Sequence, residues 1–255
     1  MKQFDLLPPP PCIASSRDWC RYYSQNAVDR FAIPWERGAE ITDAERDAIG
    51  ASLAAWQLGE TSEGTHLLAA ARNYAARIGD PVYVEAVTLF IREEQRHGSE
   101  IGRFLDLANI PRLRKNWGDS LFRGVRYFLP TMEMWTTPVV MVETLAMVYY
   151  NAVRKATDSP VLQTLCRQIL RDEVQHLRFQ CERLAILLQP HPEPVREFVY
   201  LVMRGFFAVV TTLVWIGHQK VFHAGGHTFR TYWREAWARM NYGWERIRPE
   251  RYGLR

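Results

Sequence analysis

The chain has 255 residues, of which 47% are hydrophobic and 24% are charged, as in a globular protein with a large core. Its formal net charge of +4 is too small to require a nucleic-acid partner. The four cysteines form no CxxC pair and no zinc-like spacing, and the N-terminus lacks an apolar signal-peptide segment. We therefore expect a reduced, cytoplasmic setting.

Two long helices are predicted in the first half of the chain. Thr42 and Glu45 form a capping box that opens the first helix, which runs to Gly79, an effective stop. Asp80 and Pro81 then supply the N-cap and the first-turn proline of the second helix.

Two more helices follow a long break. Residues 108–130 can cross the length of a helix bundle, and the third helix begins between Thr131 and Pro138. Pro160 starts the fourth helix, which ends near Gln189. Strand signals are nearly absent. Two antiparallel helix pairs joined by one long crossover are typical of an all-α four-helix bundle.

A fifth predicted helix, residues 195–221, approaches the length of a membrane span. Arg204 lies inside it, and Glu197 and Lys220 flank it, so we expect it to pack against the bundle or a dimer partner, without stable membrane insertion. A final amphipathic helix lies in residues 228–255, which hold seven Arg and three Glu and thus a net charge of +4. We expect a solvated helix or a dimer contact there, with a nucleic-acid or membrane surface as the alternative.

The predicted organisation has three parts. Residues 1–41 form an irregular N-terminal extension, residues 42–190 form the bundle, and residues 191–255 form a C-terminal helical extension that packs on the bundle or on a dimer partner.

The most specific feature of the sequence is a repeated Glu-x-x-His tetrad. Glu94 and His97 form the first, and Glu173 and His176 form the second, 79 positions later. Each tetrad begins 13 residues after a helix-starting proline. A Glu and a His at positions i and i+3 project from one face of a helix, so each pair can converge on the same metal ion.

Each tetrad also has a carboxylate about 30 residues upstream. Glu143 lies in a strongly apolar helix, where an ionised carboxylate is costly unless it is paired or metal-bound. Glu143 precedes Pro160 by 17 positions, and Glu63 precedes Pro81 by 18, whereas Glu60 precedes it by 21. The repeat therefore favours Glu63 as the ligand and leaves Glu60 as a carboxylate near the site or in solvent.

Other histidines are weaker metal-ligand candidates. His66 follows Glu63 at i+3, but a third such pair would be unusual, so we expect it near the site or on the helix surface without a metal bond. The histidines His218, His223 and His227 cluster near the Gly225-Gly226 turn. They form no i,i+4 pair within one helix and have no adjacent carboxylate, so we do not expect a second site there.

Carboxylates with two imidazoles suit iron and manganese better than zinc, which favours fewer oxygen ligands. Over about residues 45–190 the pattern resembles the ferritin-like diiron-carboxylate superfamily, which includes bacterial multicomponent monooxygenase hydroxylases, ribonucleotide reductase small subunits, acyl-carrier-protein desaturases, rubrerythrins and ferritins. The resemblance implies two iron ions, or a manganese–iron pair, with Glu94 and Glu173 as bridging carboxylates. The implied ligands are Glu63, Glu94, His97, Glu143, Glu173 and His176.

Within this superfamily, the sequence favours an oxygen-activating enzyme. Two complete tetrads argue against storage ferritins, and the lack of CxxC pairs argues against rubrerythrins. Ile101 stands where a radical-storing tyrosine usually follows the first tetrad, and Tyr150 remains a weaker candidate for redox work near the site. We expect a diiron oxidoreductase, either an oxidase or a monooxygenase. It would use dioxygen, a small and largely apolar substrate and an external electron donor. We also expect the protein to form a homodimer. The alternatives are a ferroxidase or peroxide-scavenging protein, and a tRNA-hydroxylase-like enzyme using the basic C-terminus.

Overall fold

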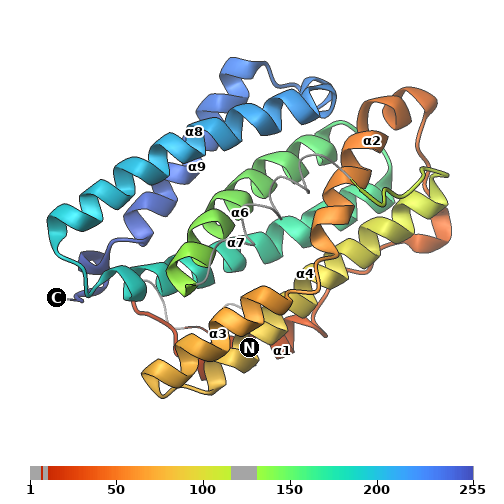
Figure 1. The fold of residues 1–255 in the computed structure, drawn as a ribbon. Helices are drawn as coiled ribbons and strands as arrows, with labels where there is room; N and C mark the ends of the chain where they lie inside the picture. Colours follow the sequence, from red (N-terminus) through yellow and green to blue (C-terminus); the bar gives the residue numbers. More distant parts are fainter. Residues whose placement is uncertain (1–6, 8–10, 116–130, 255) are drawn as a thin grey trace.

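The computed structural model describes residues 7, 11–115 and 131–254, which form helices and contain no strand (Figure 1). The described helices are α1 (Ser16–Asn26), α2 (Asp43–Glu60), α3 (Thr65–Ile78), α4 (Val82–Leu107), α6 (Met132–Lys155), α7 (Pro160–Leu188), α8 (Glu193–Ala224) and α9 (Phe229–Arg246), with 3-10 helices at Trp35–Arg37 and Pro249–Tyr252.

The long helices pack side by side as the predicted all-α bundle. Helices α6 and α7 form one close pair, and α4 forms the other with α2 and α3, which follow one another along it (Figure 1). Helix α4 also contacts α7, which brings the two tetrad-bearing helices together. Part of the predicted crossover, residues 116–130, lies outside the described residues.

The prediction of one helix from Thr42 to Gly79 is wrong, because the chain breaks between α2 and α3. Gly64 caps α3 with a left-handed backbone (φ 67°), which glycine adopts without a steric penalty. A Cβ atom there would lie 2.6 Å from Cδ1 of Ile91 on α4. The break therefore lets both α2 and α3 pack closely along α4. The close contact between Gly64 and Ile91 requires a residue without a side chain at this break.

The N-terminal extension is more ordered than the predicted irregular segment. Ser15 and Asp18 form a capping box at the start of α1, and the aromatic side chains of Trp19, Tyr22 and Tyr23 are buried in the contact of α1 with the bundle. Because Ser15 and Asp18 fit the capping-box pattern, the sequence did contain a signal for this helix.

Asp80 does not cap α4 as predicted. Pro81 occupies the N-cap position without a side-chain hydrogen bond, and the Asp80 carboxylate instead accepts a 2.6 Å hydrogen bond from Oγ of Ser16. Asp80 thus joins α1 to the start of α4. The predicted capping box of Thr42 and Glu45 is confirmed.

Helices α8 and α9 cover one side of the bundle. Helix α8 contacts α2, α6 and α9, and it kinks at His218, where φ is −131°. Among the described residues, α8 is the one helix long and apolar enough to cross a membrane. Helix α9 returns along α6 and α7.

Candidate metal centre

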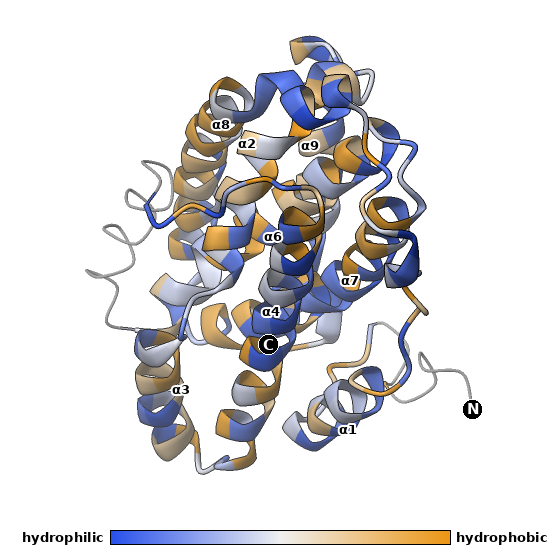
Figure 2. Ribbon diagram, turned by 90° about the vertical axis from the view of Figure 1, so that its right-hand side faces the viewer, coloured by the Kyte–Doolittle hydropathy of each residue, from blue (hydrophilic) through white to orange (hydrophobic). Residues whose placement is uncertain are grey.

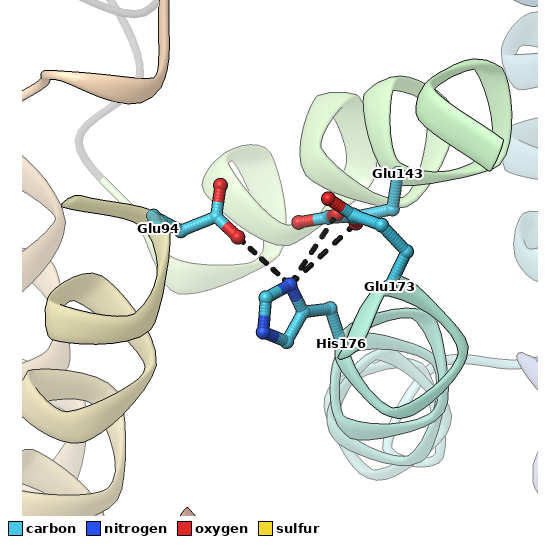
Figure 3. A group of neighbouring side chains, drawn as sticks. All are labelled: Glu94, Glu143, Glu173 and His176. Carbon is cyan, nitrogen blue, oxygen red and sulfur yellow. Dashed lines mark ion pairs between the residues drawn. The ribbon is translucent and has the colours of Figure 1, made fainter. Parts of the chain in front are cut away.

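Three bundle helices direct carboxylates and a histidine to one point in the interior. Figure 3 shows Glu94 approaching His176 from α4 on one side, while Glu143 of α6 and Glu173 of α7 approach from the other. All but Glu94 are buried, and its side chain is 23% exposed. The i,i+3 spacing places the carboxylate and imidazole of each tetrad on the inward face of its helix.

The distances suit metal coordination. Nδ1 of His176 lies 2.7 Å from Oε1 of Glu94, 3.5 Å from Oε2 of Glu173 and 3.8 Å from Oε2 of Glu143. Ligand atoms of these four residues all lie within 4.8 Å of one another. A second group with the same spacing contains Glu60, Glu94 and His97. Glu94 is common to both groups.

The second tetrad also reaches the second group. Nδ1 of His97 lies 3.9 Å from Oε1 of Glu94 and 3.9 Å from Oε1 of Glu173. Glu173 is therefore close to both histidines, one on its own helix and one on α4. The two groups share Glu94 and form one continuous cluster.

The structure corrects the choice between Glu60 and Glu63. Glu60 ends α2 and is 8% exposed, inside the cluster, whereas Glu63 is exposed in the connection between α2 and α3. The spacing argument assumed one continuous helix, and the break at Gly64 removes Glu63 from the inward face. Glu60 takes the position that the sequence assigned to Glu63.

The other predicted neighbours of the site differ in their positions. The Tyr150 hydroxyl donates a 2.7 Å hydrogen bond to Oε1 of Glu60, which places Tyr150 beside the cluster. His66 is exposed on α3 and is not part of either group. Ile101 is fully buried in the apolar core.

Two carboxylates behind the histidines were missed by the sequence reasoning. Nε2 of His97 lies 3.0 Å from Oδ2 of Asp172 on α7, and Nε2 of His176 lies 3.0 Å from Oε2 of Glu93 on α4. Each histidine is thus held by the opposite helix, with Nδ1 left facing the cluster. Such carboxylate–histidine contacts fix the ring orientation of metal ligands. The available signal was the acidic residue immediately before each tetrad.

Asn26 of α1 joins these two carboxylates. Its Nδ2 donates hydrogen bonds of 2.6 Å to Oε1 of Glu93 and 2.9 Å to Oδ1 of Asp172, and its Oδ1 accepts one from Arg171 at 3.0 Å. Nη2 of Arg96 also lies 2.6 Å from Oδ2 of Asp172. Burial raises the pKa of Asp172, but its contacts with His97 and Arg96 bring that pKa below the usual range, so Asp172 stays ionised.

The cluster carries more carboxylates than the protein can keep charged without a counterion. Burial, and then the neighbouring Glu94, raise the pKa of Glu60. Burial and Glu173 likewise raise the pKa of Glu143. Burial also raises the pKa of Glu173 itself, to about 7. The crowding of buried acids therefore favours bound protons or metal cations.

One ion pair holds its charge within this cluster. Burial would raise the pKa of Glu94, but the charge of His176 brings it down to about 2. Burial would lower the pKa of His176, but the charge of Glu94, followed by further contacts with Glu173, Glu93 and Glu94, raises it well above the usual value. Glu94 and His176 therefore stabilise each other's charged forms inside the cluster.

Buried atoms without a hydrogen bond test whether metal ions fit here. Nδ1 of His97 and Oε2 of Glu173 are buried and lack a hydrogen-bond partner. Oε1 of Glu94 and Nδ1 of His176 are also buried and form no hydrogen bond of good geometry, although they lie 2.7 Å from each other. They belong to the cluster and are of the types that bind iron and manganese. Because buried polar atoms normally have a partner, the missing partners fit metal ions.

Comparison with known proteins agrees with the fold. No family model matches the sequence, and no curated protein matches it. One solved structure that matches is a mutant of an R2-like ligand-binding oxidase with an aerobically reconstituted Mn/Fe cofactor, at a TM-score of 0.59 and 16% identity over 92% of this chain and 93% of that chain. The likeness confirms the predicted all-α ferritin-like fold.

Proposed function

We propose that this protein is a dimetal-carboxylate oxidase or monooxygenase that uses dioxygen. The observation that carries the proposal is the buried convergence of four carboxylates and two imidazoles, with ligand atoms that lack hydrogen-bond partners. Two divalent ions would balance four ionised carboxylates, which the protein alone does not neutralise. The proposed ligands are Glu60, Glu94, His97, Glu143, Glu173 and His176.

The surrounding residues would prepare this site for metal. Asp172 and Glu93 would accept hydrogen bonds from the Nε2–H groups of His97 and His176, which would leave each Nδ1 lone pair free for a metal. Tyr150 orients Glu60 through its hydroxyl group. An iron pair or a manganese–iron pair, when bound, supplies the redox chemistry that dioxygen reduction requires.

The aromatic surroundings favour a dry site and a small, largely apolar substrate. Phe90 packs edge-on against His176 with ring centroids 4.9 Å apart, and Tyr23 lies 6.2 Å from the same ring. Such side chains exclude water from charged groups, which strengthens the interactions within the site. An external electron donor would return the metals to the reduced state. All four cysteines are free, which fits the reducing cytoplasm in which we propose the enzyme acts.

Metal content tests the ligand set. The wild-type protein loaded with ferrous iron should hold two ions per chain, and His97→Ala or His176→Ala should lose at least half of them. His66→Ala, a histidine exposed on α3, is the matched control and should keep full occupancy. Full metal content in both site variants would exclude this site.

A second comparison tests the corrected carboxylate. Glu60→Ala should lose more iron than Glu63→Ala, because Glu60 is buried in the cluster and Glu63 is exposed. If Glu63→Ala lost more, the order inferred from the sequence spacing would be restored.

Reaction class is tested with dioxygen. The ferrous protein should consume dioxygen, and an added apolar substrate with an electron donor should be oxidised in repeated turnovers. Formation of an iron mineral core without substrate oxidation would instead favour storage. Anomalous scattering at the iron and manganese edges would distinguish an iron pair from a manganese–iron pair.

A further inference from the structure

Helix α8 exposes a long apolar surface that the bundle does not cover. Figure 2 shows hydrophobic residues along α8 at the edge of the molecule. Seven of its large apolar side chains are between 36% and 67% exposed: Val195, Phe198, Leu201, Val202, Phe206, Val209 and Ile216. We call these residues, with Gly205 and Thr212 between them, the α8 stripe.

Along the centre of the α8 stripe, exposed residues recur at seven-residue intervals. One row has four β-branched side chains at seven-residue intervals, namely Val195, Val202, Val209 and Ile216. A second row begins three residues later, namely Phe198, Gly205 and Thr212. Alternating steps of three and four residues give a period of 3.5, the pattern of a helix that packs along another helix.

The stripe lies opposite the face of α8 that packs on its own chain. Met203, Phe207 and Thr211 are buried on the inner face and lie roughly 100–160° around the helix from the row through Val202 and Val209. The heptad repeat therefore matches the free face of α8 and is not explained by packing within this chain.

We propose that the α8 stripe binds the α8 stripe of a second copy of this chain in an antiparallel pair. Each of the seven exposed side chains offers roughly 100 Å², or about 700 Å² in all, which exceeds the largest apolar patch of a typical monomer. The same figure is close to the roughly 800 Å² that each partner buries in a standard interface.

The sequence along the stripe favours a close antiparallel arrangement. A register that matches the two rows places Phe198 against Ile216 of the partner subunit and Gly205 against Val209 of the partner subunit. No atom lies within 4 Å of the position of a Cβ on Gly205, so a second helix can approach closely there.

A lipid surface fits α8 less well. A single helix that crosses a membrane alone is surrounded by lipid, whereas the inner face of α8 packs on α2, α6 and α9 of its own chain. Helices that lie on membranes carry a predominantly basic polar face. The polar residues of α8 carry both signs of charge, Glu193 and Glu197 as well as Arg204 and Lys220.

Sedimentation equilibrium of the full chain tests the proposal. The wild type should be a dimer at micromolar concentration, and Val202→Glu should raise the dimer dissociation constant by at least about 100-fold, because two charges enter the interface core. Val28→Glu is the matched control, since Val28 is 75% exposed and lies outside α8. A monomeric wild type, or a Val202→Glu protein that dimerises like the control, would overturn the proposal.

Two further measurements distinguish the alternatives. Spin labels on Gln219→Cys, with the exposed Cys12 changed to serine, should lie about 35 Å apart in the antiparallel pair and about 10–15 Å apart in a parallel one. A distance in the parallel range would refute the orientation. Flotation of a monomeric wild type with phosphatidylcholine vesicles would show a lipid-binding surface in place of the dimer.

Discussion

The contact between Asn26 and the carboxylates behind the two histidines gives a sharp prediction for Asn26→Ala. Asn26 is fully buried, as is Asp172, and Glu93 is 4% exposed. The substitution removes one donor from each carboxylate and the acceptor used by Arg171. It should therefore lower both the free energy of unfolding and the affinity for metal.

The magnitude follows from the two hydrogen bonds to buried carboxylates. Each bond to a charged group contributes about 1.5–3 kcal/mol. Because both share one network and water can partly replace the lost donor, we expect a total loss of about 3–5 kcal/mol. For a chain of this size, each kcal/mol lowers Tm by about 2–4 °C, so the midpoint should fall by roughly 10 °C. Loss of ring positioning should weaken metal binding by about 10–100-fold.

Chemical denaturation of the metal-free protein measures the first effect, and a competitive chelator titration measures the second. Asn151→Ala is a suitable control, because Asn151 is only partly buried and accepts a hydrogen bond from Arg154 away from the cluster. A loss below about 1 kcal/mol, with unchanged metal affinity, would refute a role for Asn26 in holding the histidines.

Two other predictions concern pH and packing. Burial raises the pKa of Glu173 from 4.5 in its ordinary state to about 7, so the folded, metal-free protein keeps a proton that the unfolded chain has already lost. Its contribution to stability is present below pH 4.5 and is lost as the pH rises through 7. On this basis, denaturant titrations should show the free energy of unfolding of the metal-free protein falling by on the order of 3 kcal/mol between pH 5 and 8. Equal stability at both pH values would contradict this, and the metal-loaded protein should lack the fall. Separately, a Cβ at Gly225 would lie 2.6 Å from the carbonyl oxygen of Ala152. Gly225→Ala should therefore lower the free energy of unfolding by about 1–3 kcal/mol through overpacking, and Tm should fall with it. Gly243→Ala, where nothing lies within 4 Å, should leave Tm unchanged or higher.

Local features of the sequence predicted the helices and most of the cluster. Glu94 with His97, and Glu173 with His176, lie three residues apart, and helical geometry alone directs both members of each pair to one face. The capping box at Thr42 correctly marked the start of α2. These predictions succeed because they depend on contacts within one or two turns of the same helix.

Tertiary structure decided which side chains complete the site. Glu60 replaced Glu63 because Gly64 must pass close to Ile91 on another helix, a contact that spacing along one helix does not reveal. The support of His97 by Asp172 joins residues 75 positions apart in the sequence.

The peripheral helices α1 and α8 show the same contrast between what the sequence predicts and what tertiary packing decides. The apolar composition of α8 was evident from the sequence, but its packing determined which face is buried and which is left as the heptad stripe. Helix α1 could have been recognised from its capping box, whereas the insertion of Asn26 between two carboxylates required the folded bundle. Sequence periodicity fixes where side chains point on one helix, and only packing between helices fixes what they meet.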